Sequence, residues 1–246
     1  MAERWHTFPA QMGEHRAFIT FDESYAREAP KDARSVLVKV RAVIKKPNAS
    51  GMPTDQEFPE LRALDANLET SFNSNGGRFV GNVTVNGRRY FYYYVSCTEN
   101  DAAELIQRTS RETGYDLAYV YEEDSAKQGY FNDLYPTPDD WQMIKDLQVL
   151  DVLRERGDAT QKPREISHWA YFADPEQARR FADWAKANNY NVGDIEPLET
   201  SGKTTVRLSH VGTVVLEDIT RHTIGLNRKA RELNGDYDGW ETSIES

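Results

Sequence analysis

Strand-like and helix-like segments follow one another in the first half of the chain in an order that few folds accommodate. Alternating β-branched and aromatic residues indicate strands, and apolar residues spaced by three and four indicate amphipathic helices. One strand is followed by a helix, two strands, a helix and a last strand, over residues 36–44, 54–72, 78–96, 100–113 and 115–123, and a further strand at 18–22 precedes them. Asn86-Gly87 divides residues 78–96 into a hairpin, because this pair suits a two-residue turn.

The second half of the chain repeats this order without visible sequence identity to the first half. Its segments are a strand at 164–172, a helix at 174–189, strands at 190–198 and 203–210, and a helix at 213–235. Only residues 240–244 remain for a fourth strand. We therefore predict an α+β protein made of two ferredoxin-like sandwich domains, each with the split β-α-β order.

A helix and a short polar linker separate the two halves. Thr137 and Pro138 suit the N-cap and the first position of a helix over residues 137–157. The polar residues 158–163 then read as a linker. We expect an N-terminal α+β domain of unknown function at 1–135, a connecting segment at 136–163, and a ferredoxin-like domain at 164–246.

The charge of the chain indicates which partners it can bind, and its cysteine content indicates the compartment in which it folds. The chain has 40 acidic and 30 basic residues, a net charge of −10, which argues against broad nucleic-acid binding and fits a basic or neutral protein partner. It has one cysteine, Cys97, and therefore no internal disulfide. The N-terminus lacks the features of a signal peptide, and no apolar stretch reaches the roughly 20 residues that span a bilayer. We expect a cytoplasmic protein.

The sequence contains none of the common nucleotide-binding, hydrolase or metal-binding motifs, so it predicts no cofactor, no metal ion and no catalytic residue. The histidines of the second half are the exception to weigh. His168 and His210 fall on neighbouring strands and face one core layer, whereas His222 is expected to lie too far along its helix to join them. A metal or general-base site could be built there, but core histidines are the more common case.

One face of the predicted second sheet carries side chains suited to binding. Trp169 and Tyr171 share one side of their strand, and Arg207 occupies the matching side of the neighbouring strand. Aromatic residues on an open sheet can stack RNA bases, but residues 164–246 have 10 basic and 14 acidic residues. Trp, Tyr and Arg are also the common hot-spot residues of protein interfaces, so a protein-binding patch and ordinary packing remain as alternatives.

The C-terminal stretch NGDYDGWETSI, residues 234–244, places two tight turns and two aromatic side chains where chains usually fray. One interpretation is a terminal clasp, in which Trp240 fixes the chain end to the core. The other is an exposed tip that binds a partner through Tyr237, Asp238 and Trp240. We favour the clasp and keep all three residues as binding candidates.

These residues carry a family resemblance. The segments REISHWAYFADPEQARRFADWAKANNYNV, VRLSH and YDGWET resemble the bacterial regulator of ribonuclease E activity B family over about residues 160–244. The segments GMPTDQEFPELRALDANLETSF and RFVGNVTVNGRRYFYYYV are similar to the bacterial family called domain of unknown function 695, over roughly residues 5–125. The first resemblance implies a non-catalytic protein that binds ribonuclease E, lowers its activity and so alters RNA turnover.

We therefore expect a cytoplasmic enzyme inhibitor whose partner is ribonuclease E or a related nuclease, and not a nucleic-acid-binding or membrane protein. An enzyme or small-ligand-binding protein, using an inter-domain cleft or the layer of His168 and His210, is the alternative. In a third possibility the first domain sets the function and the second serves oligomerisation.

Overall fold

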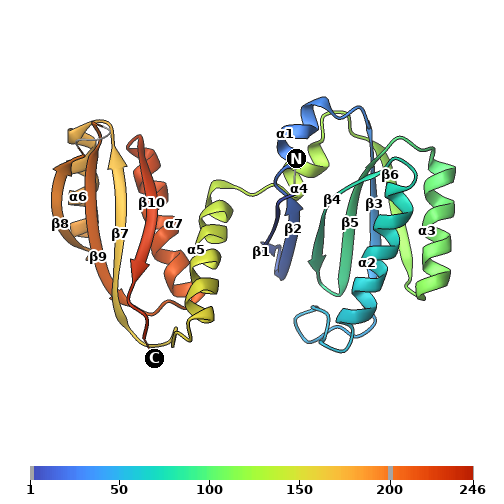
Figure 1. Cartoon of the computed structure of the whole chain (residues 1–246), viewed down its shortest axis with the longest axis horizontal. Coiled ribbons are helices and arrows are strands. Elements are labelled where there is room, and N and C mark those ends of the chain that lie inside the picture. The colour runs from blue at the N-terminus through green and yellow to red at the C-terminus, as the bar shows by residue number, and fades with distance from the viewer. Residues whose placement is uncertain (1–2, 199–201, 246) are drawn as a thin grey trace. The chain divides into compact units, whose positions relative to one another are not determined.

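The structure is a computed structural model of the chain, and it describes residues 3–198 and 202–245 (Figure 1). It divides into two compact units, Met1–Tyr135 and Pro136–Ser246, called here the first and the second unit.

The first unit is a six-stranded antiparallel sheet with two long helices on one face (Figure 1). The elements are β1 (Trp5–Met12), β2 (His15–Asp22), α1 (Tyr25–Glu28), a short 3-10 helix (Ala29–Lys31), β3 (Val36–Val43), α2 (Phe58–Asn73), β4 (Arg78–Val85), β5 (Arg88–Val95), α3 (Glu99–Thr113), β6 (Leu117–Glu123) and α4 (Gln128–Asp133). The strand order is β1-β2-β4-β5-β3-β6. Strands β4 to β6 and β3, with α2 and α3, form the predicted ferredoxin-like order, and the β1–β2 hairpin extends the sheet beyond β4.

Strand β5 shows how an aromatic run can be covered on both sides, as its sequence predicts. Phe91 and Tyr93 face the helices and lie in the core formed with α2 and α3. On the other face, Tyr92 donates a hydrogen bond to Asp133 at 3.0 Å, and Tyr94 donates one to a second carboxylate, Asp124. The β4–β5 turn has the positive φ values at Asn86 and Gly87 that the hairpin prediction requires.

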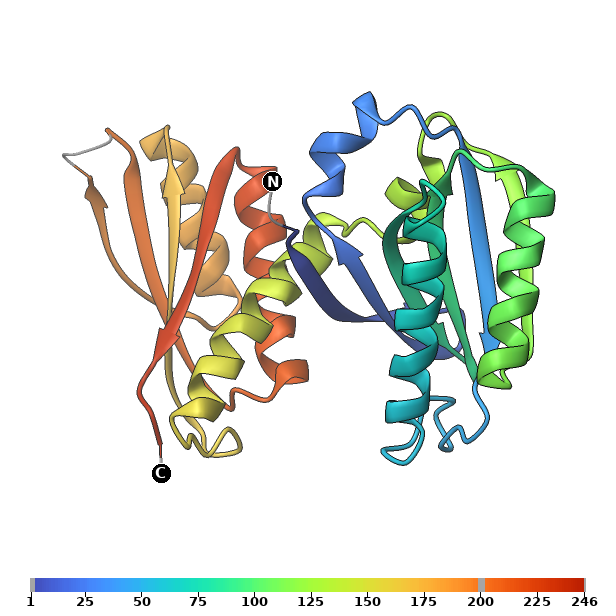
Figure 2. The same cartoon turned by 45° about the vertical axis from the view of Figure 1, so that its right-hand side comes forward.

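The second unit is a four-stranded antiparallel sheet of order β10-β7-β9-β8 (Figure 2). Its elements are α5 (Pro138–Glu155), β7 (Arg164–Phe172), α6 (Pro175–Ala187), β8 (Asn191–Pro197), β9 (Thr204–Gly212), α7 (Leu216–Glu232) and β10 (Gly235–Thr242). Helices α6 and α7 pack on one face through small and aromatic side chains such as Ala182, Phe181 and Ala230. The fold class is therefore confirmed: both units are α+β sandwiches with the split β-α-β order.

Helix α5 is part of the second unit and does not stand apart as the connecting segment that we expected at 136–163. Leu150 and Leu153 of α5 pack in a buried cluster with Ile219 of α7 and Trp240 of β10. The helix has one apolar stripe, and this stripe is buried against α7 and β10, because an isolated amphipathic helix would leave it in water.

The start of α5 offers a test of local stability. The side chain of Thr137 accepts a hydrogen bond from the backbone N–H of Asp140, and the Asp140 carboxylate accepts one from the backbone N–H of Thr137. Replacing Thr137 by alanine removes this capping box and is expected to cost about 1 kcal/mol. Thermal unfolding of the full chain measures the loss. Thr137→Ser keeps the hydroxyl and should behave like the parent; equal losses in both variants would contradict the capping argument.

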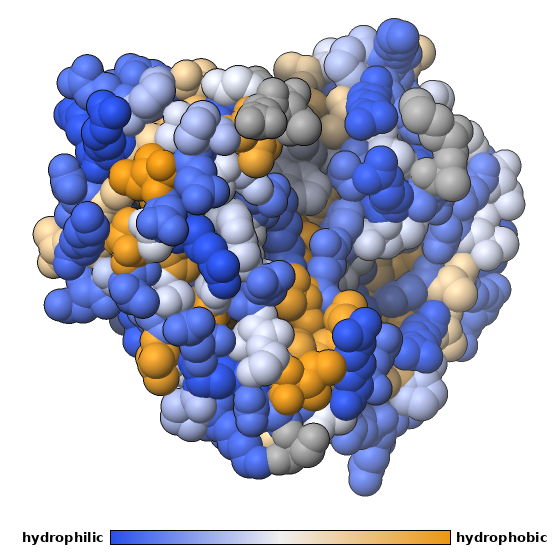
Figure 3. All heavy atoms as spheres, turned by 60° about the vertical axis from the view of Figure 1, so that its left-hand side comes forward, coloured by the Kyte–Doolittle hydropathy of each residue, from blue (hydrophilic) through white to orange (hydrophobic). Residues whose placement is uncertain are grey.

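The surface matches the polar composition. The face drawn in Figure 3 is mostly hydrophilic, with hydrophobic side chains in small separate groups, as expected from a mean hydropathy of −0.74. None of the helices in the described residues has the length and hydropathy of a membrane-spanning segment.

Candidate protein-binding site

The face of the second-unit sheet opposite α6 and α7 gathers the binding candidates of β7 and β9. Along β7, His168 and Ala170 are buried on the helix side, whereas Trp169 and Tyr171 alternate with them and are partly exposed. Trp169 pairs with Arg207 across the β7–β9 ladder. The guanidinium of Arg207 lies 5.5 Å from the centroid of the Trp169 ring, within the range of a cation–π interaction. The structure thus brings Trp169, Tyr171 and Arg207 together on one face, here called the outer face.

Two of the C-terminal candidates are almost fully buried, and their part in a binding surface stays a prediction. Tyr237 and Trp240 are only 5% and 7% exposed, and they point to the helix side of β10. Asp238 is exposed between them, at the irregularity where the β10–β7 register shifts. The clasp interpretation accounts for both aromatic side chains, because β10 is a full eight-residue strand paired with β7.

Trp240 is held by a buried carboxylate that sequence reasoning did not single out. Its indole N–H donates to Asp146 at 2.9 Å, and the same carboxylate accepts hydrogen bonds from Gln142 and Thr223. Asp146 is fully buried, and burial raises its pKa while these donors lower it. In the sequence, Asp146 lies near Ile144 and four residues before Leu150, on the buried side of α5. A carboxylate at such a position could have been recognised as buried from the sequence.

Two shallow depressions flank Trp169 on the outer face. One lies toward β10 and α5, and the other toward β8. Five exposed carboxylates line them: Asp238 and Glu241 in the first, and Glu165, Asp194 and Glu196 in the second. In the part of the chain that the structure describes, no ion pair holds any of these five. Apart from Asp238, the sequence analysis did not select them. Alternation along the strand does place Glu165, four residues before Trp169, on the same side as Trp169.

The histidines of the second unit form a row of contacting rings, in which His168 is buried and His210 and His222 are partly exposed. His168 contacts the hydroxyl of Tyr237 through Nδ1 at 2.8 Å and Nδ1 of His210 through Nε2 at 2.9 Å. The ring of His222 stacks on that of His210 with centroids 3.7 Å apart, and Tyr190 contacts its Nδ1.

The expectation that His222 would miss the other two histidines is wrong. Helix α7 begins at Leu216, so His222 lies only six residues into it, about 9 Å at 1.5 Å per residue. The helix packs back over the sheet, which places this turn above the end of β9.

The protonation of this row is suppressed. Burial, with a smaller contribution from the neighbouring histidines, lowers the pKa of His168 to about 3 and that of His210 to about 4. Burial also lowers the pKa of His222. Both ring nitrogens of His168 are hydrogen-bonded to neighbouring side chains. Among the described residues, no group of three or more His, Cys, Asp or Glu could hold a metal ion. The row therefore favours a neutral core cluster over a catalytic site.

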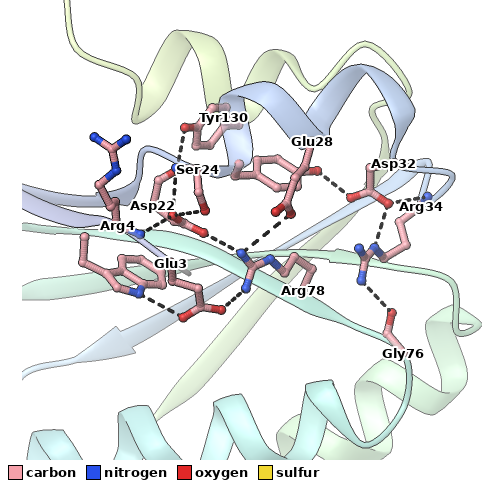
Figure 4. Close-up of polar contacts among 12 residues, drawn as sticks. Glu3, Arg4, Asp22, Ser24, Glu28, Asp32, Arg34, Gly76, Arg78 and Tyr130 are labelled. Carbon is pink, nitrogen blue, oxygen red and sulfur yellow. Dashed lines mark hydrogen bonds and ion pairs between the residues drawn. The ribbon is translucent and has the colours of Figure 1, made fainter. Parts of the chain in front are cut away.

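In the first unit, a polar network links the N-terminal hairpin to β4 (Figure 4). Arg78 of β4 contacts Asp22, Glu3 and Glu28. Asp22 is fully buried, and its other oxygen accepts hydrogen bonds from Ser24 and from the backbone N–H of Arg4. Both carboxylate oxygens of Asp22 are thus engaged, which indicates a structural tie.

Comparison with known proteins bears on both units. Residues 143–242 match the model of the family Regulator of ribonuclease activity B, and residues 3–135 match that of the Family of unknown function (DUF695). A search of curated proteins finds no match to this chain. A solved structure titled "Crystal Structure of an Unknown Protein from Galdieria sulphuraria" is 12% identical over 85% of this chain and 99% of that one, but its TM-score of 0.23 carries no argument.

Both resemblances drawn from the sequence are confirmed, in the predicted order along the chain. The DUF695 model covers more than half of the residues, and the second model covers nearly all of the second unit. The chain belongs to the DUF695 family of unknown function, and its residues 143–242 are similar to the family Regulator of ribonuclease activity B.

Proposed function

We propose that this protein is a non-catalytic regulator that binds a ribonuclease, ribonuclease E or a related nuclease, and lowers its activity, so that RNA turnover slows. The observation that carries the proposal is the match of residues 143–242 to the family Regulator of ribonuclease activity B. The outer face supports it, because Trp169, Tyr171 and Arg207 form a cluster of residue types common in protein interfaces.

The chemistry of the second unit favours binding over catalysis. His168 uses its ring nitrogens on Tyr237 and His210, so it presents no free base to a substrate. The net charge of −10 disfavours direct contact with RNA phosphates and favours a basic protein partner. The single cysteine fits a reducing compartment, and we place the protein in the bacterial cytoplasm.

The test is a cleavage assay with purified ribonuclease E, a fluorescent RNA substrate and the full chain. We expect cleavage to slow as the chain is added, and Trp169→Ala to need about tenfold more protein for the same effect, since an interface hot spot contributes more than about 1 kcal/mol. Asp183→Asn, on exposed α6, is the control and should inhibit like the parent. An unchanged cleavage rate and no complex at micromolar concentrations would contradict the proposal.

A further inference from the structure

We infer that the outer face is a docking surface for an extended Lys/Arg-rich protein segment, which crosses the sheet over Trp169 and places cations in both acidic depressions. This inference rests on the proposed function only for the identity of the partner. The segment chemistry itself follows from three features of the face: its unpaired charge, its aromatic centre and the spacing of its two edges.

The charge of the outer face is one-sided. Five exposed carboxylates line the two depressions, whereas only two basic side chains, Lys145 and Arg207, lie among the lining residues. Asp236, farther along β10, is exposed but already paired with Lys203 at 2.7 Å. Carboxylates without an internal partner attract cations of a binding partner and repel phosphates. A basic protein segment therefore fits this face, and RNA does not.

The centre of the face is suited to hold such a segment by stacking. Arg207 already lies over one side of the Trp169 ring, which shows that a guanidinium can sit there. Gly239 pairs with Trp169 on the β10 side. Apart from its two chain neighbours, no other residue in the described part of the chain has a heavy atom within 4 Å of the place where a Cβ at Gly239 would stand. The space beside the indole is thus open to a second Arg or Lys side chain, which gains from the ring face as well as from the carboxylates.

The spacing of the acidic groups selects an extended conformation. Four of the five carboxylates lie on the two edge strands, β10 and β8, with β7 and β9 between them, and the fifth, Glu165, lies on β7. Three strand-to-strand steps of about 4.8 Å separate these edges by about 14 Å. An extended chain advances about 3.4 Å per residue, so cations about four residues apart reach both depressions from one segment.

The experiment measures binding of a fluorescein-labelled peptide of about twelve residues, with Arg at every fourth position and Ser and Gly elsewhere, to the full chain by fluorescence anisotropy. Two comparison peptides are used. One has the same composition but with its Arg residues adjacent, and the other has Glu in place of each Arg. We expect the spaced Arg peptide to bind at least about threefold more tightly than the clustered one, and the Glu peptide not to bind. Affinity should fall between about 50 mM and about 200 mM salt.

Variants locate the site. Asp194→Asn with Asp238→Asn neutralises one carboxylate in each depression, and Asp183→Asn with Glu155→Gln neutralises two exposed carboxylates on helices α6 and α5. Both pairs change the net charge equally. We expect the first double substitution to weaken binding about three- to tenfold, because each surface ion pair that it removes contributes up to about 1 kcal/mol. The second double substitution should have little effect. Trp169→Ala should weaken binding about tenfold, with circular dichroism as the check on folding.

Each failure has a distinct meaning. Equal losses from both neutralising pairs would show non-specific attraction and overturn the inference. Peptide binding without any slowing of ribonuclease cleavage would keep the docking surface and overturn the proposed function. Slowed cleavage that is insensitive to Trp169→Ala and to the first neutralising pair would keep the proposed function and overturn the docking surface.

Discussion

Replacing Trp240 by alanine is expected to destabilise the second unit by about 3–5 kcal/mol, the usual cost of removing a buried tryptophan. The side chain is 7% exposed and packs with Leu150, Leu153 and Ile219. Its loss opens a cavity where α5, α7 and β10 meet, and it also removes one of the three hydrogen bonds to the buried Asp146 carboxylate. Because most domains have a total stability of about 5–15 kcal/mol, this loss is a large share of the stability of the second unit, and the unit should unfold far more often in this variant.

Amide hydrogen exchange measured on the full chain separates the two units. Peptides from α5 and β10 should lose protection in Trp240→Ala, whereas peptides from β3 in the first unit should keep theirs, since local stability differs between cooperative units. Trp240→Phe retains most of the apolar contact and should lose only about 1–3 kcal/mol with the hydrogen bond. Trp169→Ala, on the outer face, is the matched control and should cost no more than about 1 kcal/mol. Full protection of β10 in Trp240→Ala would show that the clasp does not stabilise the unit.

Much of the fold could be predicted because its elements carry strong local patterns. Helices α2, α5 and α6 have apolar stripes, and the structure confirms Thr137 as the N-cap of α5. Strands β1 and β10 were missed or shortened for a physical reason. Pro9 in β1 and two glycines in β10 lower strand propensity, and only pairing with β2 and β7 makes these segments strands.

The candidate site was predicted where it depends on strand alternation and missed where it depends on register. Alternation alone places Trp169, Tyr171 and Arg207 on one face. The acidic residues of β8 and β10 could not be placed in the same way, because each strand contains an irregularity that shifts the alternation. For the same reason, Tyr237 and Trp240, three residues apart, both face the core.

The core of the second unit contains a polar layer between two apolar clusters. On β7, His168 lies between Ile166 of one cluster and Ala170 of the other. On α7, His222 and Thr223 lie between Ile219, in the cluster of Ile166, and Leu226, in the cluster of Ala170. Such a layer specifies how strands and helices pair, since its hydrogen bonds can be satisfied in few arrangements. It also makes the unit sensitive to protons.

Acidification from about pH 7 to about pH 5 is expected to destabilise the second unit selectively. Above the ordinary histidine pKa of 6.5, His168 is neutral in the folded and the unfolded chain, and pH has no effect through it. As the pH falls below 6.5, the unfolded chain binds a proton that the folded chain refuses, because burial holds the folded pKa of His168 at about 3. The free energy of unfolding therefore falls with pH, by about 2 kcal/mol at pH 5 from this residue alone.

The groups that face this row decide the sign and the size of the effect. The neutral hydroxyl of Tyr237 contacts His168, and that of Tyr190 contacts His222. Arg221 opposes protonation of His222, and Asp218 favours it. His210, whose pKa is lowered to about 4, adds a smaller loss because it is partly exposed to solvent, which screens the charge.

Urea unfolding of the full chain at both pH values, followed by the NMR amide signals of β7 and β9, measures this loss, and the signals of β3 report the first unit in the same sample. His168→Gln should be less stable at pH 7, because its amide cannot reproduce both hydrogen bonds, and should lose less stability on acidification. His15→Gln, at an exposed position of β2, is the control and should respond to pH like the parent. Equal acid sensitivity in His168→Gln and the parent would show that the proton uptake occurs elsewhere, and it would remove the histidine row as the source of the pH dependence.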